Sequence, residues 1–141
     1  MLQMFVWSLS LYNIIEFKVP FFYAKSRTCS FIVTEDIFIS IKKYIDQNYS
    51  NQLNLPYIAS EFHLSEPYLS RKFKAKFDIN IIQYIKLVRI RHAKQLLMSS
   101  GKKISEISLL VGYDDEKYFS RVFKEMEKIS ANDYRKKFSN K

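Results

Sequence analysis

The chain has 141 residues, a formal net charge of +9 and a hydrophobic content of 48 %. This length allows one ordinary domain or two very small units, and this hydrophobic content excludes global disorder. Two glycines and three prolines favour long helices over a many-stranded β fold. The single cysteine, Cys29, excludes an intramolecular disulfide and a zinc site built on cysteines, and it favours a reducing compartment. The excess positive charge predicts attraction to polyanions, nucleic acid first, although many surface lysines on any soluble protein give the same charge.

Residues 1–33 differ from the rest of the chain. Two apolar runs, at 1–15 and 19–24, are rich in Phe, Val, Ile and Tyr, which is typical of short strands. Neither run reaches the ~20 apolar residues of a membrane span, and the basic start of a signal peptide is missing. We therefore expect a short apolar, strand-like arm, with an anchor on a membrane surface as the alternative.

Helical periodicity begins near Thr34, which we interpret as the N-cap of a first helix. This helix should end at the polar cluster 48–51. A short helix capped by Asn54 and a further helix capped by Ser65 follow, with a three-residue break between them. A short helix, a tight break and a second capped helix predict a helix-turn-helix unit.

A long helix is predicted over residues 81–98, capped by Asn80 and about 27 Å long at 1.5 Å per residue. The pattern of short helix, turn and capped helix then recurs. Asp115 stands at the cap position of a helix over 116–126, and Ser130 caps a last helix.

A seven-residue stretch occurs twice, as Tyr68–Lys74 (YLSRKFK) and Tyr118–Lys124 (YFSRVFK). Five of its seven positions are identical, and the offset from 68 to 118 continues into the pairs Ile79/Ile129 and Tyr84/Tyr134. A match of this length indicates one structural unit that is used twice.

Each copy of the repeat has two faces. Leu69 and Phe73, like Phe119 and Phe123, are four residues apart and are predicted to face the core. Ser, Arg and Lys then lie on the exposed side of the second helix of a helix-turn-helix unit, the helix that enters the major groove. Arg pairs with guanine, Ser reaches several bases and Lys suits phosphate. One such face can be a solvated basic surface, but two matching faces favour contact with nucleic acid.

Residues from about 36 to 138 resemble the DNA-binding domain of the AraC/XylS family of transcription regulators. The resemblance rests on the stretches LNLPYIASEFHLSEPYLSRKFK, YIKLVRIRHAKQLL and ISEISLLVGYDDEKYFSRVFKEMEKISANDYR. It implies an all-α domain over 34–141, with helix-turn-helix units at about 34–79 and 102–138 and a linker helix at about 81–98. It also implies an activator that binds double-stranded promoter DNA and contacts RNA polymerase. The absence of catalytic motifs and of metal-ligand spacing in the sequence predicts no enzymatic activity, cofactor or metal, and we expect a cytoplasmic protein.

The resemblance also implies which residues contact DNA. Those expected to read bases are Glu66, Pro67, Ser70 and Arg71 in the first unit, and Glu116, Lys117, Ser120 and Arg121 in the second. Lys74 and Lys124, together with Lys102 and Lys103, are expected to contact phosphates. Arg89 matches an arginine of the family's linker helix, and we interpret it as a backbone-supporting or ion-pairing residue that reads no base.

The sequence departs from the family pattern after each second helix. The family usually has glycine there, at a turn with positive φ, whereas this chain has Asp78 and Lys128. A lysine in that conformation costs roughly 1–2 kcal/mol. In the turns, His63 occupies the position that Gly112 fills in the second unit.

Many family members carry a sensor domain before the DNA-binding domain, and residues 1–33 are too few to form one. We expect either a stand-alone regulator or a fragment of a longer one, with residues 1–33 as the remnant of a sensor domain. The alternative function is a protein-interaction module that pairs with a full-length relative. Residues 1–33 would then form the contact with that relative or with a second copy of the chain.

Overall fold

The structure is a computed structural model that describes the backbone of residues 30–138 and the side chains of residues 37–138. These residues form seven helices and no strand, which confirms the all-α class for the described part of the chain. In order they are α1 (Ser30–Asn48), α2 (Leu55–Glu61), α3 (Glu66–Phe77), α4 (Ile81–Ser99), α5 (Ile104–Leu110), α6 (Glu116–Glu127) and α7 (Ala131–Phe138). The predicted strand-like arm lies outside the described residues over positions 1–29.

The prediction that the first helix begins at Thr34 is wrong, because α1 already begins at Ser30. Residues 31–33 are Phe, Ile and Val, which the composition assigned to the strand-like arm. Neither glycine nor proline interrupts the chain there, and each residue that extends an existing helix adds a hydrogen bond. The β preference of these side chains is too weak a prior to stop that extension.

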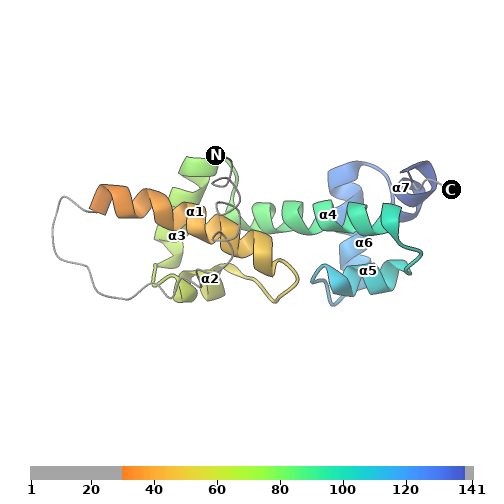
Figure 1. Cartoon of the computed structure of the whole chain (residues 1–141), viewed down its shortest axis with the longest axis horizontal. Helices are drawn as coiled ribbons and strands as arrows, with labels where there is room; N and C mark the ends of the chain where they lie inside the picture. The colour runs from red at the N-terminus through yellow and green to blue at the C-terminus, as the bar shows by residue number, and fades with distance from the viewer. Residues whose placement is uncertain (1–29, 139–141) are drawn as a thin grey trace, which may run out of the picture.

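The linker helix α4 carries one helical unit at each end (Figure 1). Its N-terminal half contributes Ile81, Tyr84, Ile85 and Val88 to a core that α1, α2 and α3 complete. Its C-terminal half contributes Ile90, Ala93 and Leu97 to a second core shared with α5, α6 and α7. The two cores are separate clusters of buried residues, and α4 contributes side chains to both of them.

Most of the predicted N-caps are confirmed by hydrogen bonds from their side chains. The side chains of Asn54, Asn80 and Asp115 accept hydrogen bonds from backbone N–H groups in the first turns of α2, α4 and α6. Ser130 accepts one from the N–H of Asp133 at 3.1 Å. Ser65 occupies the N-cap position of α3 but makes no cap hydrogen bond through its side chain.

Arg89 lies on α4 between the two cores and is one of two buried polar residues among those described. Its Nε donates to the carbonyl of Tyr49 at 2.8 Å, and its Nη2 donates to the carbonyl of Asn51, also at 2.8 Å. The guanidinium also lies over the ring of Tyr113, 5.0 Å from its centroid. The interpretation of Arg89 as a residue that supports the backbone is therefore confirmed.

Four described residues have positive φ: His63, Asp78 and Lys128 at 53°, 55° and 64°, and Gly112 at 90°. Asp78 and Lys128 are the left-handed C-caps of α3 and α6, as the comparison with the family pattern predicted. Both stand where helices usually end in glycine.

Replacing Lys128 with glycine is expected to raise the free energy of unfolding by about 0.5–1 kcal/mol. Relief of the left-handed strain gains about 1–2 kcal/mol, and the greater freedom of glycine in the unfolded chain offsets part of it. The hydrogen bond lost from the Lys128 ammonium to the carbonyl of Glu125 is exposed. Thermal unfolding followed by circular dichroism measures the change. Glu125→Gly, in the last turns of α6, is the matched control and should cost about 1 kcal/mol; a lower melting temperature for Lys128→Gly would contradict the strain argument.

Candidate nucleic-acid interface

The helix α3 displays the first set of predicted contact residues. Leu69 and Phe73 are fully buried, which directs the opposite side of the helix to solvent. Ser70 is half-buried, and the remaining predicted residues of this unit are exposed: Glu66, Pro67, Arg71 and Lys74. The structure thus brings all five onto one accessible side of the second helix of the first unit.

The helix α6 repeats this arrangement in the second unit. Phe119, Val122 and Phe123 are buried. Ser120 is half-buried, and the other predicted residues are exposed: Glu116, Lys117, Arg121 and Lys124. The recurring Ser-Arg-Lys set therefore has the same exposure in both units, which is the geometry that the repeat predicted.

Arg121 has a neighbour that the sequence analysis missed. Its guanidinium lies over the ring of Tyr118, 5.6 Å from the centroid. The ammonium of Lys86, on α4, lies 5.9 Å from the centroid of the same ring. The equivalent tyrosine of the first unit, Tyr68, packs instead against Phe38 of α1 at 6.1 Å. A cation over an exposed ring contributes about 0.5–1 kcal/mol. The spacing of Tyr118 and Arg121 by three residues in a helix was the available signal.

The three acidic residues before and at the start of α6 have separate roles. Asp115 accepts from the N–H of Lys117 at 2.7 Å and of Tyr118 at 3.3 Å, so it is committed to the cap. Asp114 accepts a hydrogen bond from the side-chain amide of Gln52. Glu116 is the exposed carboxylate of the first turn. It can accept a hydrogen bond from the amino group of cytosine, and it repels phosphate.

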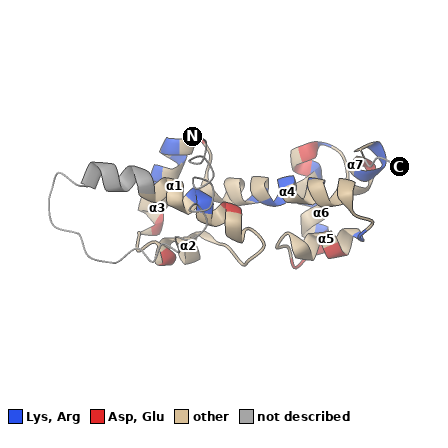
Figure 2. Cartoon of the chain, in the orientation of Figure 1, with Lys and Arg blue, Asp and Glu red and all other residues tan. Residues whose placement is uncertain are grey.

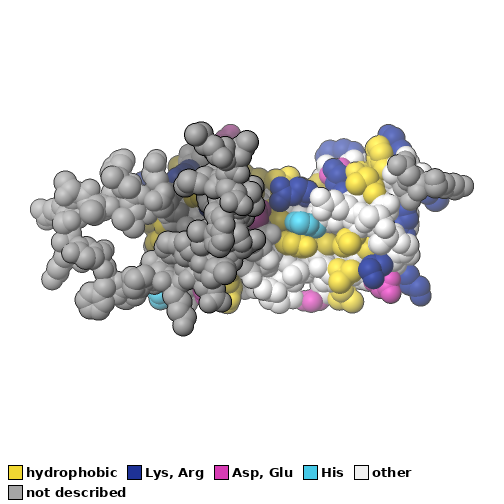
Figure 3. All heavy atoms as spheres, in the orientation of Figure 1, with side chains coloured by type: hydrophobic (Ala, Val, Ile, Leu, Met, Phe, Trp, Pro, Cys, Tyr) yellow, Lys and Arg dark blue, Asp and Glu magenta, His cyan; other side chains and the backbone are white. Residues whose placement is uncertain are grey.

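Basic residues are spread over both units and the linker. Figure 2 shows Lys and Arg on α3, along α4 and on α7. On the face drawn in Figure 3, basic side chains lie over α4 and around the end that holds α7, interspersed with hydrophobic ones. Lys102 and Lys103 are exposed between α4 and α5, where Arg135 of α7 donates to the carbonyl of Lys102. Positive charge therefore flanks the second unit at the α5–α7 end.

No group of three or more His, Cys, Asp or Glu side chains that could hold a metal ion occurs among the described residues. No helix within residues 30–138 is both long enough and apolar enough to cross a membrane.

Two helix-turn-helix units, held by one helix and exposing the same basic residues, define a double helix-turn-helix protein. A family model described as a helix-turn-helix domain matches residues 58–137. The lactose operon transcription activator of Staphylococcus xylosus is 34 % identical over 108 residues, which cover 77 % of this chain and 38 % of that protein. This chain therefore spans less than half the length of that relative.

Solved structures show the same arrangement. The C-terminal domain of AraT, a response regulator from Geobacillus stearothermophilus, matches with a TM-score of 0.73 and 34 % identity, over 74 % of this chain and 88 % of that one. A transcriptional regulator from Chromobacterium violaceum with an AraC-type DNA-binding domain matches in fold, with a TM-score of 0.68 and 22 % identity, over 77 % of this chain and 97 % of that one. The chain belongs to the AraC/XylS family of transcription regulators and carries the DNA-binding domain of that family.

Proposed function

We propose that the protein binds double-stranded promoter DNA by inserting α3 and α6 into adjacent major grooves, and that it activates transcription. The observation that carries the proposal is the recurrence of the same exposed Ser-Arg-Lys set on the second helix of both units. A solvated basic face on one helix needs no function, but the same exposed residues on the second helix of both units favour contact with nucleic acid.

The length of α4 supports simultaneous contact with two grooves. Its 19 residues give a rod of about 28 Å, and the units extend beyond both ends. Successive major-groove faces on one side of a duplex are ~34 Å apart. One chain can therefore present two reading helices at the spacing that other helix-turn-helix proteins reach through a dimer.

The proposed roles follow from the chemistry of each side chain. Arg71 and Arg121 read guanine, and Ser70 and Ser120 reach neighbouring base edges. Glu66, Glu116 and Lys117 discriminate at the start of each helix, and Pro67 offers only an apolar contact. Lys74, Lys124, Lys102 and Lys103 contact phosphates and set the salt dependence. Because the guanidinium of Arg121 lies over the ring of Tyr118, we propose that this contact lowers the entropy cost of ordering Arg121 and that α6 contributes more specificity than α3.

Activation in the cytoplasm through RNA polymerase is part of the same proposal. It is supported by the family and by the function that the name of the Staphylococcus xylosus relative states. Leu109 and Leu110 of α5 are 61 % and 48 % exposed, so this helix presents apolar side chains to which a protein partner can bind.

Arg121→Ala is expected to weaken binding to a selected duplex by about 1–3 kcal/mol and to relax the preference at one base pair. Lys124→Ala should weaken binding to all sequences alike and reduce the salt slope by about 1. Selection from random DNA supplies the duplex, and titration at several salt concentrations measures both effects. Lys43→Ala, at an exposed lysine on α1, is the control for loss of one positive charge.

The experiment also distinguishes the two alternative functions, DNA binding and interaction with another protein. Unchanged affinity and unchanged base preference in Arg121→Ala would show that α6 is not a reading helix. Failure of the unmodified chain to shift any duplex at ~100 mM salt, together with capture of a related regulator, would favour the protein-interaction module.

A further inference from the structure

The loop between α1 and α2 contacts the turn between α5 and α6, although these segments belong to different units (Figure 1). A Cβ placed on Gly112 would lie 2.8 Å from the carbonyl oxygen of Ser50 and 2.9 Å from that of Tyr49. Contacts under 3.0 Å to backbone are ones that a Cβ essentially never makes. Two backbones thus approach so closely that only glycine fits. We call the contact between residues 49–52 and residues 112–114 the inter-unit joint.

Three further contacts hold the joint. Arg89 donates to the carbonyls of Tyr49 and Asn51 and lies over the ring of Tyr113, so one guanidinium contacts both segments. The ring of His92, on α4, stacks on Tyr49 with centroids 4.0 Å apart and planes 3° apart. The side-chain amide of Gln52 donates to the carboxylate of Asp114. Tyr49 also packs against both hydrophobic cores.

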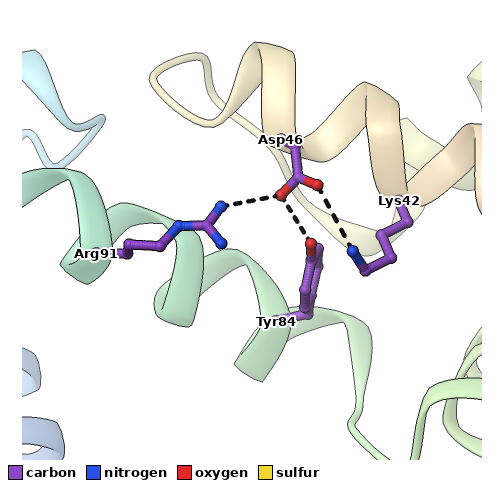
Figure 4. Close-up of polar contacts among 4 residues, drawn as sticks. All are labelled: Lys42, Asp46, Tyr84 and Arg91. Atoms are coloured by element: carbon purple, nitrogen blue, oxygen red, sulfur yellow. Dashed lines mark hydrogen bonds and ion pairs between the residues drawn. The ribbon is translucent and has the colours of Figure 1, made fainter.

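The helix that carries the loop is itself fixed to the linker. Asp46, near the end of α1, accepts a hydrogen bond from the Tyr84 hydroxyl at 2.7 Å and pairs with Arg91 at 3.4 Å, both on α4 (Figure 4). The ammonium of Lys42 lies 3.7 Å from the other oxygen of the same carboxylate. The loop at the end of α1 therefore extends from a helix that cannot shift along α4 without breaking these contacts.

The turn of the first unit shows what is particular to Gly112. His63 occupies the equivalent position with a φ of 53°, a conformation that a non-glycine residue tolerates at modest cost. Gly112 has a φ of 90° and the close approach of Tyr49 and Ser50. Two features therefore disfavour a side chain at Gly112: its own φ of 90° and the backbone of the other unit.

We propose that the inter-unit joint fixes the orientation of α3 relative to α6 and thereby sets the half-site spacing that the protein accepts; this rests on the proposed DNA binding. Long helices can bend, and a helix as the sole connection would leave the two units free to tilt. The joint adds a second point of attachment beside the helix. Gly112, Arg89 and Gln52 are positioning residues in this sense, because they act on the reading helices through the loop and the turn.

The first test measures orientation without DNA. In the full chain with Cys29→Ser, spin labels at cysteines replacing the exposed Ala75 of α3 and Glu125 of α6 report the distance between the reading helices. Gly112→Ala forces the loop off the turn, and Gln52→Ala removes a surface hydrogen bond without touching either core. Both should broaden the distance distribution. Gly101→Ala is the control for a glycine-to-alanine change in open space, because a Cβ there meets nothing within 4 Å.

The second test measures spacing on DNA. One base pair added between the half-sites of a selected duplex rotates the second half-site by about 34–36°. The unmodified chain and Gly101→Ala should lose about tenfold or more in affinity when one half-site is misplaced. In Gly112→Ala and Gln52→Ala this penalty should fall below about threefold, because a looser connection reaches both half-sites at several spacings.

The outcomes are distinct. A Gly112→Ala protein that keeps its helical circular dichroism, its narrow label distances and its full spacing penalty would overturn the proposal. If Gly112→Ala fails to fold, Gln52→Ala decides by the same two measurements. If the unmodified chain binds no duplex, the proposed function fails, and the label distances still decide whether the joint fixes the two helices.

Discussion

Replacing Phe123 with alanine is expected to lower the free energy of unfolding by about 3–5 kcal/mol. Phe123 is fully buried in the second core, and its ring centroid lies 5.8 Å from that of Phe119 and 5.6 Å from that of Tyr134. The substitution removes the transfer free energy of the ring and leaves a cavity between α6 and α7. Because domains of this kind have a total stability of only ~5–15 kcal/mol, the second unit would be close to unfolding at ordinary temperatures.

Urea unfolding followed by far-ultraviolet circular dichroism measures this loss. Phe138→Ala is the matched control, since Phe138 also packs beside Tyr134, at 4.6 Å, but is 42 % exposed. It should cost less than about 1 kcal/mol. A cost for Phe123→Ala as small as that of Phe138→Ala would show that the second core is not packed as described. A second, earlier transition in Phe123→Ala alone would show that the two cores unfold separately.

Arg89→Met is expected to cost about 2–4 kcal/mol. The guanidinium makes two charge-assisted hydrogen bonds to backbone carbonyls, and hydrogen bonds to charged groups contribute ~1.5–3 kcal/mol each. Burial lowers the pKa of Arg89, but arginine remains charged in proteins and keeps all its donors. Methionine retains part of the apolar volume and offers no donor, so the carbonyls of Tyr49 and Asn51 lose these partners.

Arg91→Met provides the comparison on the same helix. The side chain of Arg91 is 56 % exposed and makes one long ion pair with Asp46 at 3.4 Å, a kind of contact worth less than about 1 kcal/mol. Chemical unfolding of both variants gives the two costs. Equal costs would show that the hydrogen bonds of Arg89 are replaced by water, and Arg89→Lys tests whether charge alone suffices without the planar pair of donors.

Much of the fold could be predicted because local signals and packing agree. The caps at Asn54, Asn80 and Asp115 marked helix starts that the structure confirms, and the apolar spacing of the repeat separated buried from exposed positions on α3 and α6. The start of α1 was wrongly predicted at Thr34, because the composition of residues 31–33 is typical of a strand. Capping is a local property, and so a sequence reveals it well.

The contacts between the units were harder to predict. The family pattern singled out Arg89, but nothing in the sequence showed that it bonds to Tyr49 and Asn51, some 40 residues earlier. The sequence showed that Gly112 lies in a turn. It did not show that the backbone of the other unit packs against this glycine. Such pairings depend on how two units are placed on one helix. Periodicity and capping describe one element at a time and carry no information on that placement.

The division of α4 between two cores has a consequence for how this chain can vary in evolution. A single residue inserted between Val88 and Ile90 would rotate everything beyond it by about 100° and shift it by ~1.5 Å. Ile90, Ala93 and Leu97 would keep their packing in the second core, but the whole second unit would turn relative to the first and the inter-unit joint would be lost. We therefore expect the length of α4 between the two cores to stay fixed in evolution: a loop such as 100–103 can change in length, while the middle of α4 can change only in its side chains.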